Sequence, residues 1–170
     1  ASHLGQKFSR HAALLVSKAR VAPLAGLTAP RSEMNSLVLA ARLNTLVLRS
    51  LSERPDCLTI LGDSECCIAA VESEGGRLAP YLANRRAELL ETFESWKGAY
   101  PELEVRPLHH VPGTLNTADL ATRGTATGPL VTEGSGWQCG PEFLTLDFEE
   151  WPVTRKIKRE IPEEELLKKE

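Results

Sequence analysis

The sequence predicts an α/β fold with parallel strands at its centre. Segments with the pattern of strands alternate with helical patterns, in the order strand, helix, strand, helix, helix, strand, helix. CLTIL, residues 57–61, is nearly continuously apolar, which is typical of a strand covered on both faces. The 170 residues are enough for one domain, and because aromatic residues make up only 5%, we expect an aliphatic core.

The first strand and helix are predicted from residues 12–51. AALLVSKARV, residues 12–21, is apolar-rich and stops before Pro23, so we expect a strand there. Ser32 can cap a helix that begins near Glu33 and runs to about Leu51. Three- and four-residue spacing gives this helix one apolar face, made of Met34, Leu37, Val38, Ala41 and Leu48.

The next two helices follow the apolar run of residues 57–61. Asp63 lies just past the end of that run, and a short helix is expected over about residues 64–73. Pro80 opens the second helix, since proline suits a first helical turn. Its apolar face consists of Leu82, Leu89, Phe93 and Trp96.

The last predicted elements lie in residues 103–124. LEVRPLHHV, residues 103–111, has the pattern of a strand, and Asn116 or Thr117 can cap a short helix that holds Asp119. Beyond residue 124 the pattern gives way to Gly, Thr, Ser and Pro. We expect the charge-dense tail, residues 154–170, to be an exposed helix or a linker.

Composition restricts the function classes. The net charge of −3 shows no basic excess of the kind usual in nucleic-acid-binding proteins. The sequence has neither a run of 18 apolar residues nor a secretory signal pattern at its start, so no membrane span and no secretion are predicted. The cysteines lack zinc-ligand spacing and are expected to be buried, reduced thiols of an intracellular protein: Cys57, Cys66, Cys67 and Cys139.

Three acidic residues occupy equivalent places in the predicted fold. Glu33 and Asp119 stand at helix starts, and Asp63 stands at a strand end. Active sites in open α/β sheets gather at the carboxyl ends of strands, and converging carboxylates require a cation such as Mg²⁺ or Mn²⁺. Taken singly, each acid also has a plainer interpretation. Glu33 and Asp119 can be first-turn acids that favour the helix dipole, and Asp63 with Ser64 can be a helix cap.

Five sequence blocks in a fixed order carry a family resemblance across residues 14–151. They are LLVSKARVAPLAGLTAPRSEMN, LGDS, PYLANRRAELL, HHVPGTLNTADLATRG and GPEFL. In this order the chain resembles the ribonuclease H-like domain of Pol polyproteins from BEL/Pao-type retrotransposons. EEWPVTRKI, residues 149–157, is similar to the stretch that precedes the integrase part of such polyproteins. We therefore expect a ribonuclease H-like domain over residues 1–125 and an extension toward the integrase region over residues 126–170.

The resemblance implies a five-stranded mixed sheet flanked by helices. It also implies that two Mg²⁺ or Mn²⁺ ions, held by four carboxylates, cut the RNA strand of an RNA–DNA hybrid during reverse transcription. By motif, Glu33, Asp63 and Asp119 match three of these metal ligands, and His110 matches the mobile histidine before the last acid. A structural loop role for His110 stays open, and alternation along the strand should turn His109 the other way.

The implied partners are the hybrid and the reverse transcriptase and integrase regions of the same polyprotein, in a cytoplasmic particle or the nucleus, without a membrane. Arginine favours phosphate, so the candidate backbone contacts are Arg20, Arg85, Arg86 and Arg123. For Arg86 a plain surface role is preferred, which leaves the other three as the prediction.

The start of the chain departs from the family pattern. The family begins with a strand that bears the first aspartate, whereas ASHLGQKFSRH contains no acidic residue, so we expect an N-terminally truncated copy with three acids. Two functions stay open: a metal-dependent ribonuclease, or an inactive truncated or domesticated remnant that serves as a structural or interaction module. Near-neutral charge and few aromatics disfavour a pure nucleic-acid-binding module.

Overall fold

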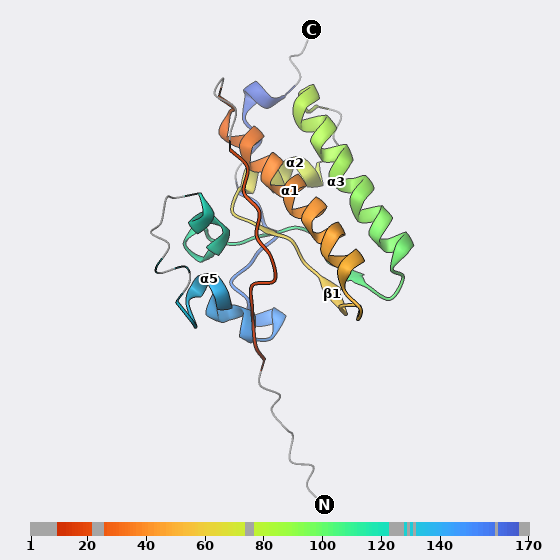
Figure 1. Ribbon diagram of the computed structural model, residues 1–170. Helices are drawn as coiled ribbons and strands as arrows, with labels where there is room; N and C mark the ends of the chain where they lie inside the picture. Colours follow the sequence, from red (N-terminus) through yellow and green to blue (C-terminus); the bar gives the residue numbers. More distant parts are fainter. Residues whose placement is uncertain are drawn as a thin grey trace, which may run out of the picture. The chain divides into compact units, whose positions relative to one another are not determined.

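The computed structural model describes residues 10–21, 26–73, 77–122, 128, 130, 132–158 and 160–166 (Figure 1). Contacts between residues divide the chain into two compact units. Unit 1 comprises Ala1–Ala19 and Pro112–Pro152, and unit 2 comprises Arg20–Val111 and Val153–Glu170. The boundary expected near residue 125 stays a prediction. Mixed helix and strand content agrees with the predicted α/β class.

The long helices of unit 2 begin with capping residues or with proline. Helix α1 spans Ala29–Ser50, α2 spans Glu65–Glu72 and α3 spans Pro80–Ala99. The expectation that α1 begins near Glu33 is wrong. Thr28 is the N-cap and accepts a hydrogen bond from the Arg31 N–H at 3.4 Å, while Pro30 suits the first turn. Glu33 therefore lies in the second turn.

The predicted strands of residues 57–61 and 103–111 pair in parallel, in two short ladders. Strand β1, Cys57–Leu58, pairs with β3, Glu104–Val105. Strand β2, Leu61–Gly62, pairs with β4, His109–His110. Two residues separate β1 from β2, whereas three separate β3 from β4. The segment between β3 and β4 therefore contains one extra residue, a bulge. Pro107 lies within this bulge, where its lack of an N–H is tolerated.

The expected five-stranded mixed sheet is not formed by the described residues. Beyond the two parallel pairs they show isolated antiparallel bridges between Leu78 and Leu166 and between His110 and Thr154. The strand expected over residues 12–21 is also absent, and Leu15 and Val21 there are 74% and 98% exposed. An apolar segment becomes a strand when a neighbour supplies backbone partners, and this segment pairs with no strand in the described part of the chain.

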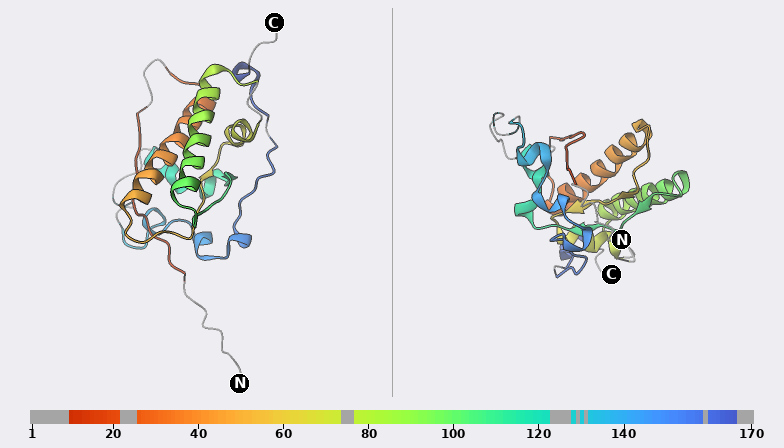
Figure 2. Two further views of the ribbon diagram at one scale, coloured as in Figure 1. Left: turned by 90° about the vertical axis from the view of Figure 1, so that its right-hand side faces the viewer. Right: turned by 90° about the horizontal axis from the view of Figure 1, so that it is seen from below.

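Helices α1 and α3 lie side by side and run parallel (Figures 1 and 2). Near their starts, the Asn35 side-chain amide donates to the Tyr81 hydroxyl at 2.8 Å. Further along, Trp96 Nε1 donates to the Thr45 hydroxyl at 2.9 Å. The polar contacts thus advance along both helices in the same direction, as expected of successive strand–helix units.

The core of unit 2 is aliphatic, as composition predicted. All five residues of the predicted α1 face are buried, and so are Leu82, Leu89 and Trp96 of α3. Phe93 packs partly buried against this core. The strands, the residues that directly precede them and α2 add Leu58, Ile60, Ile68, Val71 and Leu108, among others. Helical periodicity therefore identified which faces of α1 and α3 are buried.

The described part of unit 1 consists of short helical turns. They are η1 (Gly113–Leu115), η2 (Thr117–Ala121), α5 (Gly136–Cys139), η3 (Glu142–Thr145) and η4 (Phe148–Glu150). The Asn116 side chain accepts from the Ala118 N–H at 3.3 Å and caps η2, which confirms the predicted cap, although the helix is a 3₁₀ helix. Trp151 packs against the rings of Phe143 and Phe148, at centroid distances of 5.4 and 5.0 Å.

The charged tail is not the exposed helix or linker that we expected. Residues 153–170 group with unit 2, and the 3₁₀ turn η5, Glu163–Glu165, ends in a fully buried glutamate. Burial is tolerated because the Glu165 carboxylate binds Arg31. None of the helices in the described residues combines the length and the apolar character that crossing a membrane requires.

Candidate functional site

Asp63 lies where the sequence predicted it, directly after a parallel strand. It follows β2 and precedes Ser64, the N-cap residue of α2, and its side chain is half-buried. A Cβ atom added at Gly62 would lie 3.2 Å from Leu37 Cδ2 of α1, so the strand end packs closely on that helix. The carboxylate is thus placed at the carboxyl end of a strand, where sites in α/β proteins form.

Glu33 lies in the second turn of α1, near the start of that helix. Its carboxylate is close enough to the Cys67 thiol of α2 to influence it. Burial is the main cause that raises the pKa of Cys67 to about 12, and the charges of Cys66 and Glu33 add to the rise. The Cys67 thiol donates to the Pro30 carbonyl at 3.2 Å, which connects α2 to the first turn of α1. Two of the predicted acids therefore approach the same region of unit 2.

His110 lies on the strand beside β2. In the parallel register, His110 is opposite Gly62, the residue before Asp63. The neighbouring His109 ring contacts the Pro107 carbonyl through Nδ1 at 2.8 Å. Because successive side chains of a strand alternate, the two rings are expected to face opposite sides. His110 is thus held one strand away from the end that carries Asp63.

Asp119 lies in unit 1, in the first turn of η2, and its side chain is half-buried. Glu33 and Asp63 lie in unit 2. Within the described residues no three His, Cys, Asp or Glu side chains are gathered so that they could hold a metal ion. The convergence of all three acids therefore stays a prediction.

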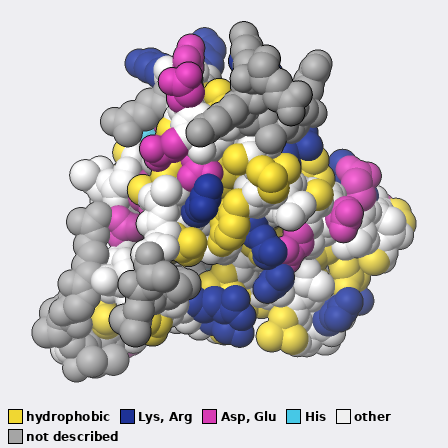
Figure 3. Space-filling model, turned by 90° about the horizontal axis from the view of Figure 1, so that it is seen from above, with side chains coloured by type: hydrophobic (Ala, Val, Ile, Leu, Met, Phe, Trp, Pro, Cys, Tyr) yellow, Lys and Arg dark blue, Asp and Glu magenta, His cyan; other side chains and the backbone are white. Residues whose placement is uncertain are grey.

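The candidate phosphate-binding arginines differ in their surroundings. Arg20 is exposed, whereas Arg85 pairs with Glu88 one turn along α3 at 2.8 Å. Arg86 donates through Nε to the Val71 carbonyl at 3.0 Å and also binds the Ser73 carbonyl, so it caps the end of α2. Arg123 lies outside the described residues. In Figure 3, Lys and Arg side chains lie among acidic and hydrophobic ones.

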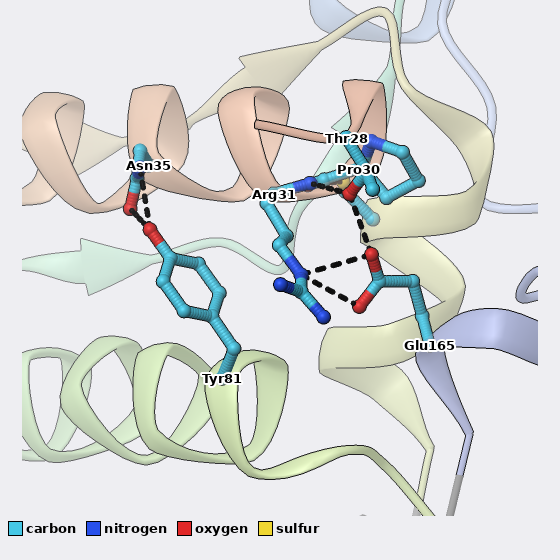
Figure 4. Close-up of polar contacts among 7 residues, drawn as sticks. Thr28, Pro30, Arg31, Asn35, Tyr81 and Glu165 are labelled. Atoms are coloured by element: carbon cyan, nitrogen blue, oxygen red, sulfur yellow. Dashed lines mark hydrogen bonds and ion pairs between the residues drawn. The ribbon is translucent and has the colours of Figure 1, made fainter. Parts of the chain in front are cut away.

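Sequence reasoning missed an ionic cluster around the buried Glu165 carboxylate at the start of α1. Arg31 Nε donates to both carboxylate oxygens of Glu165, at 3.0 and 3.1 Å, and the Thr28 hydroxyl donates to Glu165 Oε1 at 2.5 Å (Figure 4). The Arg31 guanidinium also lies 5.2 Å from the centre of the Tyr81 ring. Thr28 ahead of Pro30 is a helix-start signal that the sequence did contain.

We expect the four thiols to differ in their reactivity. The expectation of buried thiols is wrong for Cys57 and Cys139, which are exposed, whereas Cys67 is 1% exposed and has a raised pKa. At pH 8 iodoacetamide should therefore modify the two exposed thiols and leave Cys67 intact until urea unfolds the chain, because the thiolate is the reactive form. Mass spectrometry of digested peptides measures this. Modification of Cys67 at the rate of Cys139 in the folded protein would contradict the packing of α2 on α1.

Together these features define an α/β arrangement with one carboxylate, Asp63, directly after a parallel strand. Residues 3–64 match the family model described as Pao retrotransposon-like RNaseH-like domain. This match confirms the resemblance to a ribonuclease H-like domain of a Pao-type retrotransposon. The matched segment includes Glu33 and Asp63, whereas His110 and Asp119 lie beyond it. No curated protein and no solved structure matches the chain.

Proposed function

We propose that this chain is the ribonuclease H domain of a retrotransposon polyprotein, which hydrolyses the RNA strand of an RNA–DNA hybrid with a divalent metal. One observation carries the proposal: Asp63 stands at the end of a parallel strand, inside the segment that matches the family. Glu33, from the same segment, approaches the helix that Asp63 precedes. Ribonuclease H-like domains generally use divalent metals, which agrees with an acidic site of this kind.

The donor set fits Mg²⁺ or Mn²⁺. Glu33, Asp63 and Asp119 offer carboxylate oxygens, the hard ligands that these ions prefer, and all three side chains are half-buried and so accessible to a hydrated ion. When bound, such ions activate a water molecule and stabilise the leaving oxygen. The role of the three carboxylates is to hold the ions and to orient the scissile phosphate beside them.

His110 is assigned the transfer of a proton or the release of product. An imidazole changes charge near neutral pH, which suits it to accept a proton from the attacking water or to give one to the leaving oxygen. Its place on β4, opposite the residue before Asp63, supports this assignment. The polyprotein context proposed for the chain adds reverse transcriptase and integrase regions as partners.

A cleavage assay tests the proposed function. RNA labelled at one end is annealed to DNA and incubated with Mg²⁺ and the chain extended by a preceding strand that carries an aspartate, beside RNA–RNA duplex and double-stranded DNA as controls. The nuclease proposal expects fragments from the hybrid alone. Cleavage of all three substrates would contradict hybrid specificity. Binding without cleavage, by a chain that carries every expected acid, would favour the inactive remnant.

The proposed phosphate contacts have a separate test. Replacing Arg20, Arg85 and Arg123 with alanine should weaken hybrid binding and lower the slope of log affinity against log salt by about 1 for each true contact. Arg86→Ala is the matched control, because Arg86 binds the carbonyls of Val71 and Ser73. That control should lower stability and keep the slope. Fluorescence anisotropy across a salt series measures both, and an unchanged slope in the triple variant would contradict the assignment.

A further inference from the structure

The segment of residues 153–166, termed the C-terminal strap, pairs with the strand of the candidate catalytic histidine. The His110 N–H donates to the Thr154 carbonyl at 2.8 Å, and the Thr154 N–H donates to the His110 carbonyl at 3.0 Å. On its other side the strand pairs with β2, through the N–H groups of His109 and Val111. Thr154 therefore satisfies both backbone polar groups of His110, on the edge that β2 leaves open.

The middle of the strap is held at both ends of α2. Arg155 donates to Glu72 Oε1 through Nη2 at 2.8 Å and through Nε at 3.1 Å, at the last residue of the helix. The Lys158 N–H donates to Glu65 Oε2 at 3.1 Å, at the first residue of the same helix. Arg155 and Lys158 are exposed, so each contact is accessible to water and contributes modestly.

The far end of the strap is anchored by Glu165. Its carboxylate binds Arg31 and Thr28 in the first turn of α1 and is 0% exposed (Figure 4). Its carbonyl accepts from the N–H of Ala79, the N-cap residue of α3, at 2.9 Å. One residue thus holds the starts of two helices, and the negative charge suits the positive end of the α1 dipole.

Burial is concentrated at this anchor. Among the described residues of the strap, Glu165 alone is buried, while Ile157, Ile161 and Leu166 pack partly buried on the core. A segment with few buried groups opens at a lower free energy than the core beneath it. Loss of the Glu165 charge would weaken the one contact of the strap that involves a fully buried carboxylate, although its partner Arg31 is 34% exposed.

We propose that the C-terminal strap opens as a unit, that Glu165 is the latch that keeps it closed, and that Thr154 of the closed strap positions His110. The first two parts stand on the contacts alone, and the third rests on the proposed nuclease function. Thr154 and Glu165 are positioning residues in this account. The closed strap fixes the strand that carries the imidazole, and the open strap leaves that strand paired on one side.

Amide hydrogen exchange, resolved by NMR on the full chain, tests the opening. In Glu165→Gln the Thr154, Lys158 and His110 amides should exchange at least about tenfold faster, because the substitution removes the charge that strengthens the hydrogen bonds from Arg31 and Thr28. The His109 and Val111 amides, bonded to the carbonyls of Ile60 and Gly62, should keep their rates. Glu163→Gln is the matched control, because it removes the same charge from an exposed position in the same turn.

Three results of the exchange experiment would overturn the latch. The first is unchanged exchange at Thr154 and His110 in Glu165→Gln. The second is equal acceleration of the strap amides and the β4 amides, which would mean that the strap opens only with the whole unit. The third is an equal effect of Glu163→Gln, which would assign the effect to net charge.

A double-mutant cycle on hybrid cleavage tests the positioning of His110. In a chain that cleaves, Glu165→Gln should lower kcat at unchanged KM, and it should have no further effect when His110 is already alanine. Additive losses in the double variant would overturn the positioning role. Absence of cleavage in every variant would count against the proposed function. The hydrogen-exchange rates would still decide whether Glu165 keeps the strap closed.

Discussion

Asp63→Asn should reduce cleavage of the hybrid by at least about 100-fold, because misplacing reacting groups by about 1 Å already costs that much. Asparagine keeps the shape of the side chain and removes the charge that holds the metal. Asp63 lies past the end of β2 and is not part of the hydrophobic core, so the fold should persist. The loss should therefore appear in kcat for cleavage, with an unchanged circular dichroism spectrum.

The chain in which Asp63→Asn is made must itself cleave the hybrid. The family resemblance implies four acids, and the sequence supplies three. We expect negligible cleavage by residues 1–170 and recovery when a preceding strand that carries an aspartate is added. Asp63→Asn is then made in the extended chain. Robust cleavage by residues 1–170 that depends on Asp63 would contradict the need for a fourth acid.

Asp56→Asn is the matched control for this variant. Asp56 is exposed and lies directly before β1, at the opposite end of the same strand region. Its carbonyl, which accepts from the Glu104 N–H at 2.9 Å, is unaffected by the substitution. Cleavage by Asp56→Asn should stay within a factor of about two of the parent, since surface changes away from a site have small effects. An equal loss in both variants would point to general destabilisation.

Trp96→Ala should have the largest effect on stability. Trp96 is 1% exposed, packs on Phe93 at 5.4 Å between ring centroids, and donates to Thr45 of α1. Removing a buried tryptophan costs about 3–5 kcal/mol, which is a large part of the about 5–15 kcal/mol that stabilises a typical protein. Urea unfolding followed by circular dichroism measures the difference in free energy.

Two further substitutions separate the causes. Trp96→Phe keeps an aromatic ring and loses the indole N–H, so it should cost clearly less than alanine. Leu46→Ala changes a side chain of α1 that is 61% exposed and should cost less than about 0.5 kcal/mol. If Trp96→Ala destabilised the protein no more than Leu46→Ala, the packing of α3 on α1 would be wrong, and with it the placement of Glu33.

Periodicity and proline placement predicted much of unit 2. The buried faces of α1 and α3 and the start of α3 at Pro80 follow from local sequence, because apolar spacing and proline act within one or two helical turns. The start of α1 was missed because Ser32 also fits a cap, whereas Thr28 and Pro30 together determine the first turn. Asp63 was placed correctly because an apolar strand end is a local signal.

Long-range pairing accounts for what the sequence did not predict. Residues 12–21 have the composition of a strand, but a strand also needs a partner, which the segment itself does not specify. Glu165 stands in a run of glutamates, and its burial depends on Arg31, which lies 134 residues earlier in the sequence. Asp119 belongs to the other compact unit, so its approach to Glu33 and Asp63 is a prediction from motif and family resemblance alone.

The most direct test of the metal site is a crystal structure of the extended chain soaked with Mn²⁺, with anomalous scattering data. Our account predicts an anomalous peak within about 2.5 Å of carboxylate oxygens of both Asp63 and Glu33, since ligand distances to such ions are close to 2.1 Å. It further predicts that an Asp119 oxygen lies within about 7–8 Å of the same point, twice the usual spacing of two metals. A clear structure with no peak at Asp63, or with Asp63 and Glu33 on opposite faces of the strand pair, would contradict the proposed nuclease site.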